Sequence, residues 1–193
     1  MSASERKSAL ELRKARNLPW HSPPHLDFEV AKQYLVSASC YEHAFIIGKS
    51  PDRMTECESE ILSLFRELCS QVYAWCVLPN HYHALVKTEL IKELRKSIGQ
   101  FHGRASFKWN GEDDRRGRQV WYNCFERPMK SERHFFATLN YVHNNPVHHG
   151  YAQRWQDWPW SSASEFLEKM GHEKAKEMWL RYPVLDYGKN WDK

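Results

Sequence analysis

Two histidines stand two positions apart inside the apolar stretch WCVLPNHYHALVKT, residues 75–88. Side chains along a β-strand alternate between its faces, so His81 and His83 point one way while Tyr82 points the other way. One nitrogen from each neutral imidazole can bind a shared divalent cation, which also avoids the cost of a protonated histidine among apolar neighbours. The alternative is a pair of half-buried histidines bonded to backbone or water. The short pattern by itself favours that alternative.

A second polar cluster lies in LNYVHNNPVHHG, residues 139–150. On a helix, Tyr141 and Asn145 lie one turn apart on the same face. The Asn145 amide oxygen is a suitable ligand for Mg²⁺ or Mn²⁺. Tyr141 would then stand one turn from the metal, where a nucleophile is needed if the cation polarises a phosphodiester. Together, the strand and helix patterns predict one tyrosine nucleophile beside a metal with three protein ligands.

Each of these helical residues also has a structural interpretation. A tyrosine near a helix end commonly packs in the core, and an asparagine before a proline commonly acts as a cap. A separate metal cluster is a further alternative, although His143 falls off the face that Tyr141 shares with Asn145. The histidines of that cluster would be His143, His148 and His149.

The surrounding sequence predicts the elements that would bring the strand and the helix together. Ser50 and Ser131 are expected helix caps, and Pro146 is expected to end the second of these helices. Pro79 and Asn80 mark a tight turn or bulge between two strands. The expected strands are 33–47, 72–78, 81–87 and 119–129, and the expected helices are 50–68, 89–110 and 131–145, with one or two short helices in the tail.

This order of elements predicts an α+β fold. An antiparallel sheet with helices packed mainly on one face, close to a split βαβ arrangement, is the economical solution. At 193 residues the chain suits one domain. We expect an N-terminal extension over 1–32, the main domain over 33–162 and a C-terminal helical tail over 163–193.

Composition narrows the class of protein. The net charge of +4 and pI of about 8.8 lean toward a polyanionic partner, although a mixed, solvated surface explains them equally well. Five cysteines form no Cys-x-x-Cys pair, which indicates reduced thiols in a cytoplasmic protein. The charged N-terminus is not a signal peptide, and no apolar run approaches the roughly 20 residues that span a bilayer. We therefore expect a soluble intracellular protein without a membrane partner.

Positive charge gathers in the predicted helix 89–110 and the loop after it. Phosphate contacts from such a surface give affinity but little sequence choice. The candidate DNA-binding residues are Lys92, Arg95, Lys96, Arg104, Lys108, Arg115, Arg116 and Arg118. Trp109, Trp121 and Tyr122 are candidates for stacking on unpaired bases, with core packing as the alternative, which we prefer for Trp121. In WPWSS, we expect Trp158 and Trp160 to be buried in a structural corner, with contact to bases as the alternative.

Three ordered motifs, LPNHYHALV, YVHNNPVHHGY and DWPWSSA, make this chain resemble the REP-associated tyrosine transposases, bacterial relatives of the single-tyrosine HUH transposases. The similarity covers about residues 34–162. It implies a ferredoxin-like HUH nuclease fold and a single-strand DNA nuclease that depends on Mg²⁺ or Mn²⁺. His81 and His83 match the HUH pair. Tyr141 matches the catalytic tyrosine, and Asn145 matches the polar third ligand on the same helix.

The resemblance also implies a substrate and a reaction. The family typically recognises hairpin DNA from repetitive extragenic palindromes, with a guide sequence beside the hairpin. The implied reaction cleaves and rejoins a DNA strand through a 5′-phosphotyrosine intermediate and needs no nucleotide cofactor. Tyr82 departs from the bulky hydrophobic residue usual at the middle HUH position, because it adds a hydroxyl. The tail after Ser162 is open to two interpretations, contact with DNA in trans or masking of the site. A monomer and a homodimer both remain open.

Two rival functions use the same residues differently. One is a regulator of the same fold that binds hairpin DNA or RNA without cutting it. The other is a metal-dependent hydrolase that uses His81, His83 and a water, while Tyr141 only packs. A denaturant-stable protein–DNA adduct that depends on Tyr141 would distinguish a transposase from both.

Overall fold

A four-stranded antiparallel sheet lies at the centre of the computed structural model, which describes residues 32–185 and 187–188. The strands are β1 (Gln33–Ser39), β2 (Gln71–Leu78), β3 (His81–Lys87) and β4 (Phe125–Pro128). The α-helices are α2 (Pro51–Leu68), α3 (Ile91–Glu112), α4 (Glu132–His148), α5 (Ala163–Met170) and α6 (His172–Arg181). Short 3-10 turns are η1 (Tyr41–His43), η2 (Ile47–Lys49) and η3 (Trp155–Asp157). The predicted N-terminal extension, Lys32 apart, lies outside the described residues.

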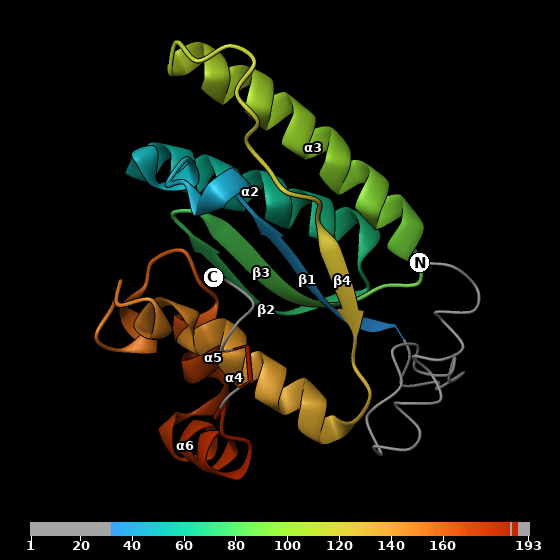
Figure 1. Cartoon of the computed structure of the whole chain (residues 1–193). Coiled ribbons are helices and arrows are strands. Elements are labelled where there is room, and N and C mark those ends of the chain that lie inside the picture. Colours follow the sequence, from blue (N-terminus) through green and yellow to red (C-terminus); the bar gives the residue numbers. More distant parts are fainter. Residues whose placement is uncertain (1–31, 186, 189–193) are drawn as a thin grey trace, which may run out of the picture.

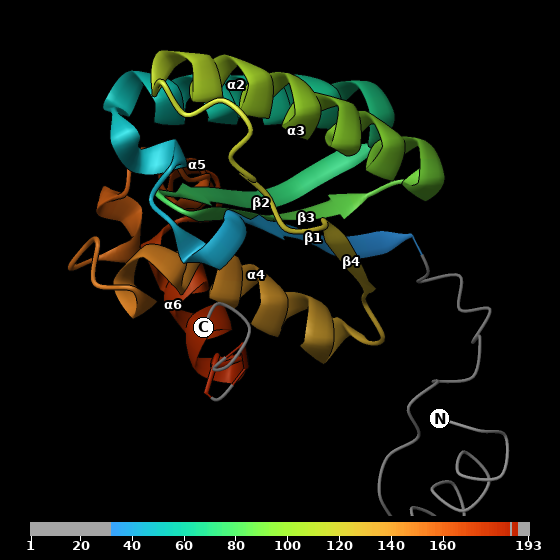
Figure 2. The same cartoon turned by 45° about the horizontal axis from the view of Figure 1, so that its top comes forward.

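The strand order is β2-β3-β1-β4, and each neighbouring pair is antiparallel. Because α2 joins β1 to β2 while β3 lies between these two strands, this is the split βαβ arrangement that the sequence predicts. The α+β fold class is confirmed. One detail of the prediction is wrong, since helices do not gather mainly on one face. Helices α2 and α3 cover one face of the sheet, and α4, α5 and α6 cover the other (Figures 1 and 2).

Local signals fix where the long helices begin and where the central strands turn. The Ser50 hydroxyl accepts a hydrogen bond from the Arg53 N–H at 3.2 Å, and the Ser131 hydroxyl accepts one from the His134 N–H at 3.1 Å. These bonds satisfy N–H groups that have no partner inside the helix. β2 and β3 are separated only by the predicted turn at 79–80. Both expectations are confirmed.

Two predicted strands are too long. The first ends at Ser39, because the Cys40 N–H bonds to the Asn80 carbonyl at 2.7 Å and the chain then enters η1. The fourth covers only β4, since Trp121 meets the sheet through a single bridge to Cys40. The segment before β4 therefore lies beside α3 as a loop, a placement that matters below.

The prediction that Pro146 ends a helix is also wrong. Pro146 lies within α4, two residues before its end. A proline removes one backbone hydrogen bond, and in a last turn the cost is limited because few bonds remain. The turn is completed by the His149 N–H bonding to the Asn145 carbonyl at 3.1 Å and the Gly150 N–H bonding to the Val147 carbonyl at 3.0 Å.

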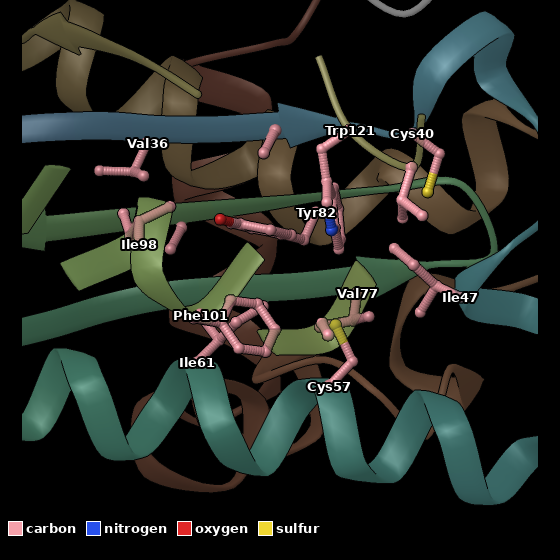
Figure 3. Packing of buried hydrophobic residues seen from close by; sticks show 14 of the residues in the cluster. Val36, Cys40, Ile47, Cys57, Ile61, Val77, Tyr82, Ile98, Phe101 and Trp121 are labelled. Atoms are coloured by element: carbon pink, nitrogen blue, oxygen red, sulfur yellow. The ribbon is translucent and has the colours of Figure 1, made fainter. Parts of the chain in front are cut away.

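Alternate residues of the central strands build two separate cores. Val36 and Tyr82 face α2 and α3 and join an apolar cluster with Trp121 (Figure 3). Leu35 and Leu85 lie on the opposite face, in a cluster that α4 completes. Since His81 and His83 share the parity of Leu85 on β3, they too face α4.

All five cysteines are free thiols, as the sequence predicts. Burial raises the pKa of the Cys40 thiol to about 12, which makes it a packing residue rather than a nucleophile. In the part of the chain that the structure describes, no helix combines the length and the apolar character needed to cross a bilayer.

Candidate metal and tyrosine site

The two histidines of β3 lie together on the face covered by α4. Their ring centroids are 5.0 Å apart, and both side chains are buried, with exposed fractions of 0% and 2%. The strand register pairs His83 with Ser37 and His81 with Ser39 on β1. Alternation along β3 sends Tyr82 into the opposite core, as the sequence predicts.

Each imidazole is held through its Nδ1 atom. His81 Nδ1 lies 2.7 Å from Asn80 Oδ1, and His83 Nδ1 lies 2.6 Å from Ser37 Oγ. Such contacts orient the ring and leave Nε2 as the atom directed into the site, as with metal-binding histidines. From the sequence, Asn80 was predicted only as part of a turn and Ser37 was not singled out, so neither was expected to contact a histidine. The pairing of Ser37 with His83 follows only from the register of β1 and β3.

The hydrogen bonds of Asn80 define the tautomer of His81. Asn80 Nδ2 donates to the His43 carbonyl at 3.1 Å, so Asn80 Oδ1 must be the atom that faces His81. This oxygen accepts the Nδ1–H of His81. In the neutral ring, Nε2 then carries a lone pair.

Helix α4 brings Tyr141 and Asn145 to the two Nε2 atoms. Asn145 Oδ1 lies 2.8 Å from His81 Nε2, and the Tyr141 hydroxyl lies 3.2 Å from His83 Nε2. The side chains of Tyr141 and Asn145 are 2% and 0% exposed. The convergence of a strand His-x-His with a helical Tyr-x-x-x-Asn is thus present in the structure.

The donor set fits a small divalent cation. The lone pair of His81 Nε2 faces the lone pairs of Asn145 Oδ1 at 2.8 Å, an arrangement that a cation would stabilise. Asn145 Nδ2 is buried and has no hydrogen-bond partner among the described residues. Rotating this amide by 180° would satisfy it against His81 without a cation, so Asn145 suits both states. His81, His83 and Asn145 are the residues that would hold Mg²⁺ or Mn²⁺.

The alternative metal cluster at the end of α4 does not form. His143 is buried on another face of the helix, where its Nε2 lies 2.9 Å from Ser162 Oγ. Within the described residues, no three His, Cys, Asp or Glu side chains come together as a metal site. His149 instead lies beside the main site, with its ring 4.9 Å from that of His81 in an edge-to-face arrangement. Sequence reasoning missed this neighbour, because His149 lies beyond the end of α4.

The C-terminal tail covers Tyr141. The ring of Tyr187 lies 5.6 Å from that of Tyr141. Gly188 approaches so closely that a Cβ atom at that position would be 2.2 Å from Tyr141 Cε2. The Tyr187 hydroxyl meets His134 at 2.9 Å and Thr138 at 2.5 Å, which fixes this segment to α4. Of the two interpretations of the tail, masking of the site agrees with this geometry.

The basic residues proposed to bind DNA follow α3 and the loop after it, but many are already paired. Arg104 contacts Glu60, Lys108 contacts Glu56, and Arg95 contacts Glu126 at 3.2 Å. Arg118 and Arg53 hold the buried carboxylate of Asp113, and these contacts keep the pKa of Asp113 well below its usual range. Lys92, Lys96, Arg115 and Arg116 are exposed. DNA contact by all eight residues stays a prediction.

The aromatic candidates separate by burial. Trp109 and Trp121 are 1% and 8% exposed and belong to the core on the α2 and α3 face, as we prefer for Trp121. Tyr122 is 41% exposed beside α3. Trp158 and Trp160 are partly buried, and the Trp158 indole N–H donates to the Val77 carbonyl at 2.8 Å, which fits a structural corner.

Comparisons with known proteins find related sequences. A provisionally named REP-associated tyrosine transposase of Haemophilus influenzae is 27% identical over 154 residues, which cover 68% of this chain and 81% of that protein. The chain is related to the REP-associated tyrosine transposases. A REP-associated tyrosine transposase of Escherichia coli K12 is 24% identical over 108 residues, or 53% of this chain and 59% of the relative. No protein-family model matches the sequence.

The fold is also similar to that of a solved structure. A solved structure described as a REP-associated tyrosine transposase bound to a REP hairpin superimposes with a TM-score of 0.56. It is 14% identical and the match covers 77% of this chain and 87% of that one. The HUH fold that the motifs predict is thereby confirmed. Division of the chain at 32 and 162, and the roles of the individual site residues, stay predictions.

Proposed function

We propose that this protein is a metal-dependent single-strand DNA endonuclease and transposase that cleaves and rejoins hairpin DNA through a 5′-phosphotyrosine intermediate. The observation that carries the proposal is the convergence of four buried side chains from two elements. Two imidazoles of β3 meet a carboxamide and a phenol of α4, with contacts of 2.8 and 3.2 Å. The relationship to REP-associated tyrosine transposases supports the same activity.

The residues divide the chemistry between them. His81, His83 and Asn145 would hold Mg²⁺ or Mn²⁺, which supplies Lewis-acid stabilisation of the charge on a phosphate oxygen. The Tyr141 oxygen attacks phosphorus and forms the phosphotyrosine bond while the bond from phosphorus to the 3′ oxygen breaks. The phenol loses a proton and the leaving 3′ oxygen gains one, so a 3′-hydroxyl results. Attack by another 3′-hydroxyl reverses these steps and rejoins the strand.

Hairpin DNA is the substrate that the comparisons favour. The solved relative holds a REP hairpin, and the present chain matches most of that structure. Exposed basic side chains on α3 and the loop after it would supply phosphate contacts. No membrane partner is proposed, and a cytoplasmic location fits a DNA substrate.

The test is a covalent adduct. The full chain is incubated with Mn²⁺ and a hairpin oligonucleotide that carries a 5′ single-stranded overhang, and the products are separated under denaturing conditions. We expect a protein–DNA adduct that is absent for Tyr141→Phe and absent with chelator. Cleavage without an adduct would overturn the proposal in favour of a hydrolase that activates water.

A second candidate function has one observation in its favour. Tyr141 is 2% exposed and lies beneath Tyr187 and Gly188, so the nucleophile is covered. A regulator that binds hairpin DNA or RNA without cutting it would show this arrangement permanently. Hairpin binding without cleavage or adduct, also after removal of residues 182–193, would favour the regulator.

A further inference from the structure

A groove outside the tyrosine site runs along one side of α3. Its other wall is the segment 118–124, which returns from the end of α3 toward β4 (yellow in Figure 1). The space between them has a volume of about 600 Å³. This segment was expected to be a strand, but it meets the sheet only through the bridge from Trp121 to Cys40 and otherwise runs as a loop beside α3.

On the α3 side, part of the groove is lined by glycines, which have no side chains. Gly99 and Gly103 lie four residues apart on one face of α3 and both line the cavity. Glycine is the least favourable residue inside a helix after proline, so packing normally explains its presence there. Here packing does not: among the described residues, a Cβ atom at either position would have no neighbour within 4 Å beyond the adjoining residues and the backbone of its own helix. The glycines keep open a space that other residues would fill.

The other residues that line the groove are suited to a ligand with anionic groups and flat rings. Arg95 is exposed at one end of the groove, one helical turn from Gly99, and its guanidinium touches Glu126 at 3.2 Å. Arg118 also lines the groove, although its guanidinium is held by Asp113 at 2.7 Å. Tyr122 offers an aromatic ring that is 41% exposed. An exposed cation and an aromatic ring are what single-stranded nucleic acid needs for phosphate contact and base stacking.

The wall beneath Tyr122 is rigid. The rings of His102 and Trp121 stack at 4.1 Å with an angle of 8° between their planes. The His102 Nε2 is fixed by the Tyr82 hydroxyl at 3.0 Å. The Trp121 indole N–H is buried and has no acceptor among the described residues, so this wall keeps an unused donor. A preformed wall loses little conformational entropy when a ligand binds.

A chain of contacts connects the groove wall with the tyrosine site. The ring of Tyr122 lies 5.0 Å from Tyr41 and 6.1 Å from His43, both in η1. The His43 carbonyl accepts from Asn80, and Asn80 in turn holds His81. A chain of contacts through η1 and Asn80 therefore joins the groove wall to the histidine pair, around the same end of β1 and β3.

We propose that this groove binds unpaired nucleotides of the DNA strand that is presented to Tyr141. The bases would lie on the floor formed by Gly99 and Gly103 and stack on Tyr122, and Arg95 would contact phosphate. This inference rests on the proposed function, because it assigns the single-stranded part of the same substrate to a surface of its own.

The experiment that tests this inference fills the groove with a side chain. Gly103→Leu adds a side chain where the structure has open space, and Gln100→Leu adds the same side chain on α3 outside the groove. Binding is measured in chelator by fluorescence anisotropy, at one salt concentration. The probes are two labelled hairpin oligonucleotides, one blunt and one with a random-sequence single-stranded flank. Thermal unfolding is measured on each variant.

We expect the wild type to prefer the flanked hairpin. Gly103→Leu should weaken binding of that hairpin by about tenfold, the value of roughly one stacked base, and leave the blunt hairpin unaffected. Its melting temperature should equal or exceed that of the wild type, because leucine favours a helix. Gln100→Leu should bind as the wild type does. Equal binding of both hairpins by the wild type, or equal behaviour of the two variants, would overturn the inference.

Measuring adduct formation distinguishes a failure of this inference from a failure of the proposed function. An adduct with the wild type, together with normal flank binding by Gly103→Leu, would reject the groove alone. Loss of flank binding in Gly103→Leu without any adduct from the wild type would keep the groove and reject the nuclease. Capture of a protein rather than DNA by the groove would reject the inference as well.

Discussion

Tyr82 and Tyr141 are both buried tyrosines whose hydroxyls meet a histidine, one on each face of the sheet. The Tyr82 hydroxyl lies 3.0 Å from His102 Nε2, and the Tyr141 hydroxyl lies 3.2 Å from His83 Nε2. Around the first pair the neighbours are aromatic, and burial raises the pKa of Tyr82 well above its usual value. The second pair continues into Ser37, and His81 stands beside it.

This comparison teaches that a buried tyrosine–histidine pair is not a site by itself. On the α2 and α3 face, the Tyr82 hydroxyl meets His102 Nε2, and the rings of Trp121 and Phe101 pack against this pair. The pair on the α4 face is joined to a second imidazole and to a carboxamide, whose oxygen faces a nitrogen lone pair. Further convergent donors, rather than burial or residue type, distinguish the candidate site.

The largest expected effect comes from removing one hydroxyl from each pair. Tyr141→Phe should abolish the adduct, a loss of roughly 10⁴-fold or more in rate, as removal of a nucleophile commonly causes. Tyr82→Phe should keep the adduct and lose about 1 kcal/mol of unfolding free energy, the value of one buried hydrogen bond. Adduct yield and urea unfolding measure the two effects. Equal activity of the two variants would end the assignment of Tyr141.

The next effect concerns the serine beside each histidine. Ser37 Oγ lies 2.6 Å from His83 Nδ1, and Ser106 Oγ donates to the His102 carbonyl at 2.6 Å. Ser37→Ala should raise the Mn²⁺ concentration for half-maximal cleavage by about 10–100-fold, because it removes the contact that orients a metal ligand. Ser106→Ala should leave the Mn²⁺ dependence unchanged. A Mn²⁺ titration of the two variants makes the comparison, and an unshifted curve for Ser37→Ala would contradict the metal site.

A smaller gain in activity is expected from the tail. Truncation after Arg181 removes Tyr187 and Gly188 from above Tyr141, whereas truncation after Gly188 keeps both. If opening this cover costs about 1.4 kcal/mol, the shorter chain should form adduct about tenfold faster. Initial rates with the hairpin oligonucleotide measure the difference. Identical rates for the two truncations would show that the cover does not limit access.

Much of the fold, and which side chains of β3 and α4 share a face at the candidate site, could be predicted from the sequence, because both depend on local periodicity. Alternation on β3 placed His81 and His83 opposite Tyr82, and helical spacing aligned Tyr141 with Asn145. Local patterns could not predict which residues of other elements lie next to these side chains. Ser37 and Asn80 reach the imidazoles through strand register and a turn, and Gly188 reaches Tyr141 from the tail.

The same reasoning explains the errors. The apolar and aromatic residues of 119–129 have strand character, but whether they pair depends on an available edge, and only β4 finds one along β1. A proline ends a helix most strongly where several turns of hydrogen bonds would otherwise follow it. Pro146 lies in the last turn of α4, so few helical hydrogen bonds follow it. Helices on both faces follow from the alternation of apolar residues on both sides of β3, which a count of elements does not reveal.

The smallest expected effect is a pH dependence of stability from the aromatic pair. Burial lowers the pKa of His102 to about 4, below the value of about 6.5 in an unfolded chain. Between these values the folded protein binds fewer protons than the unfolded chain, so this contribution is complete above about pH 6.5 and declines as the pH falls toward 4. Its slope is at most about 1.4 kcal/mol per pH unit. In a Tyr82→Phe background, His102→Phe should remove that slope while phenylalanine keeps the stack on Trp121. Urea unfolding across this pH window, with Tyr82→Phe alone as control, measures it. An unchanged slope would mean that His102 is not a buried, neutral group. The comparison of the Tyr82–His102 pair with the pair on the α4 face would then no longer hold.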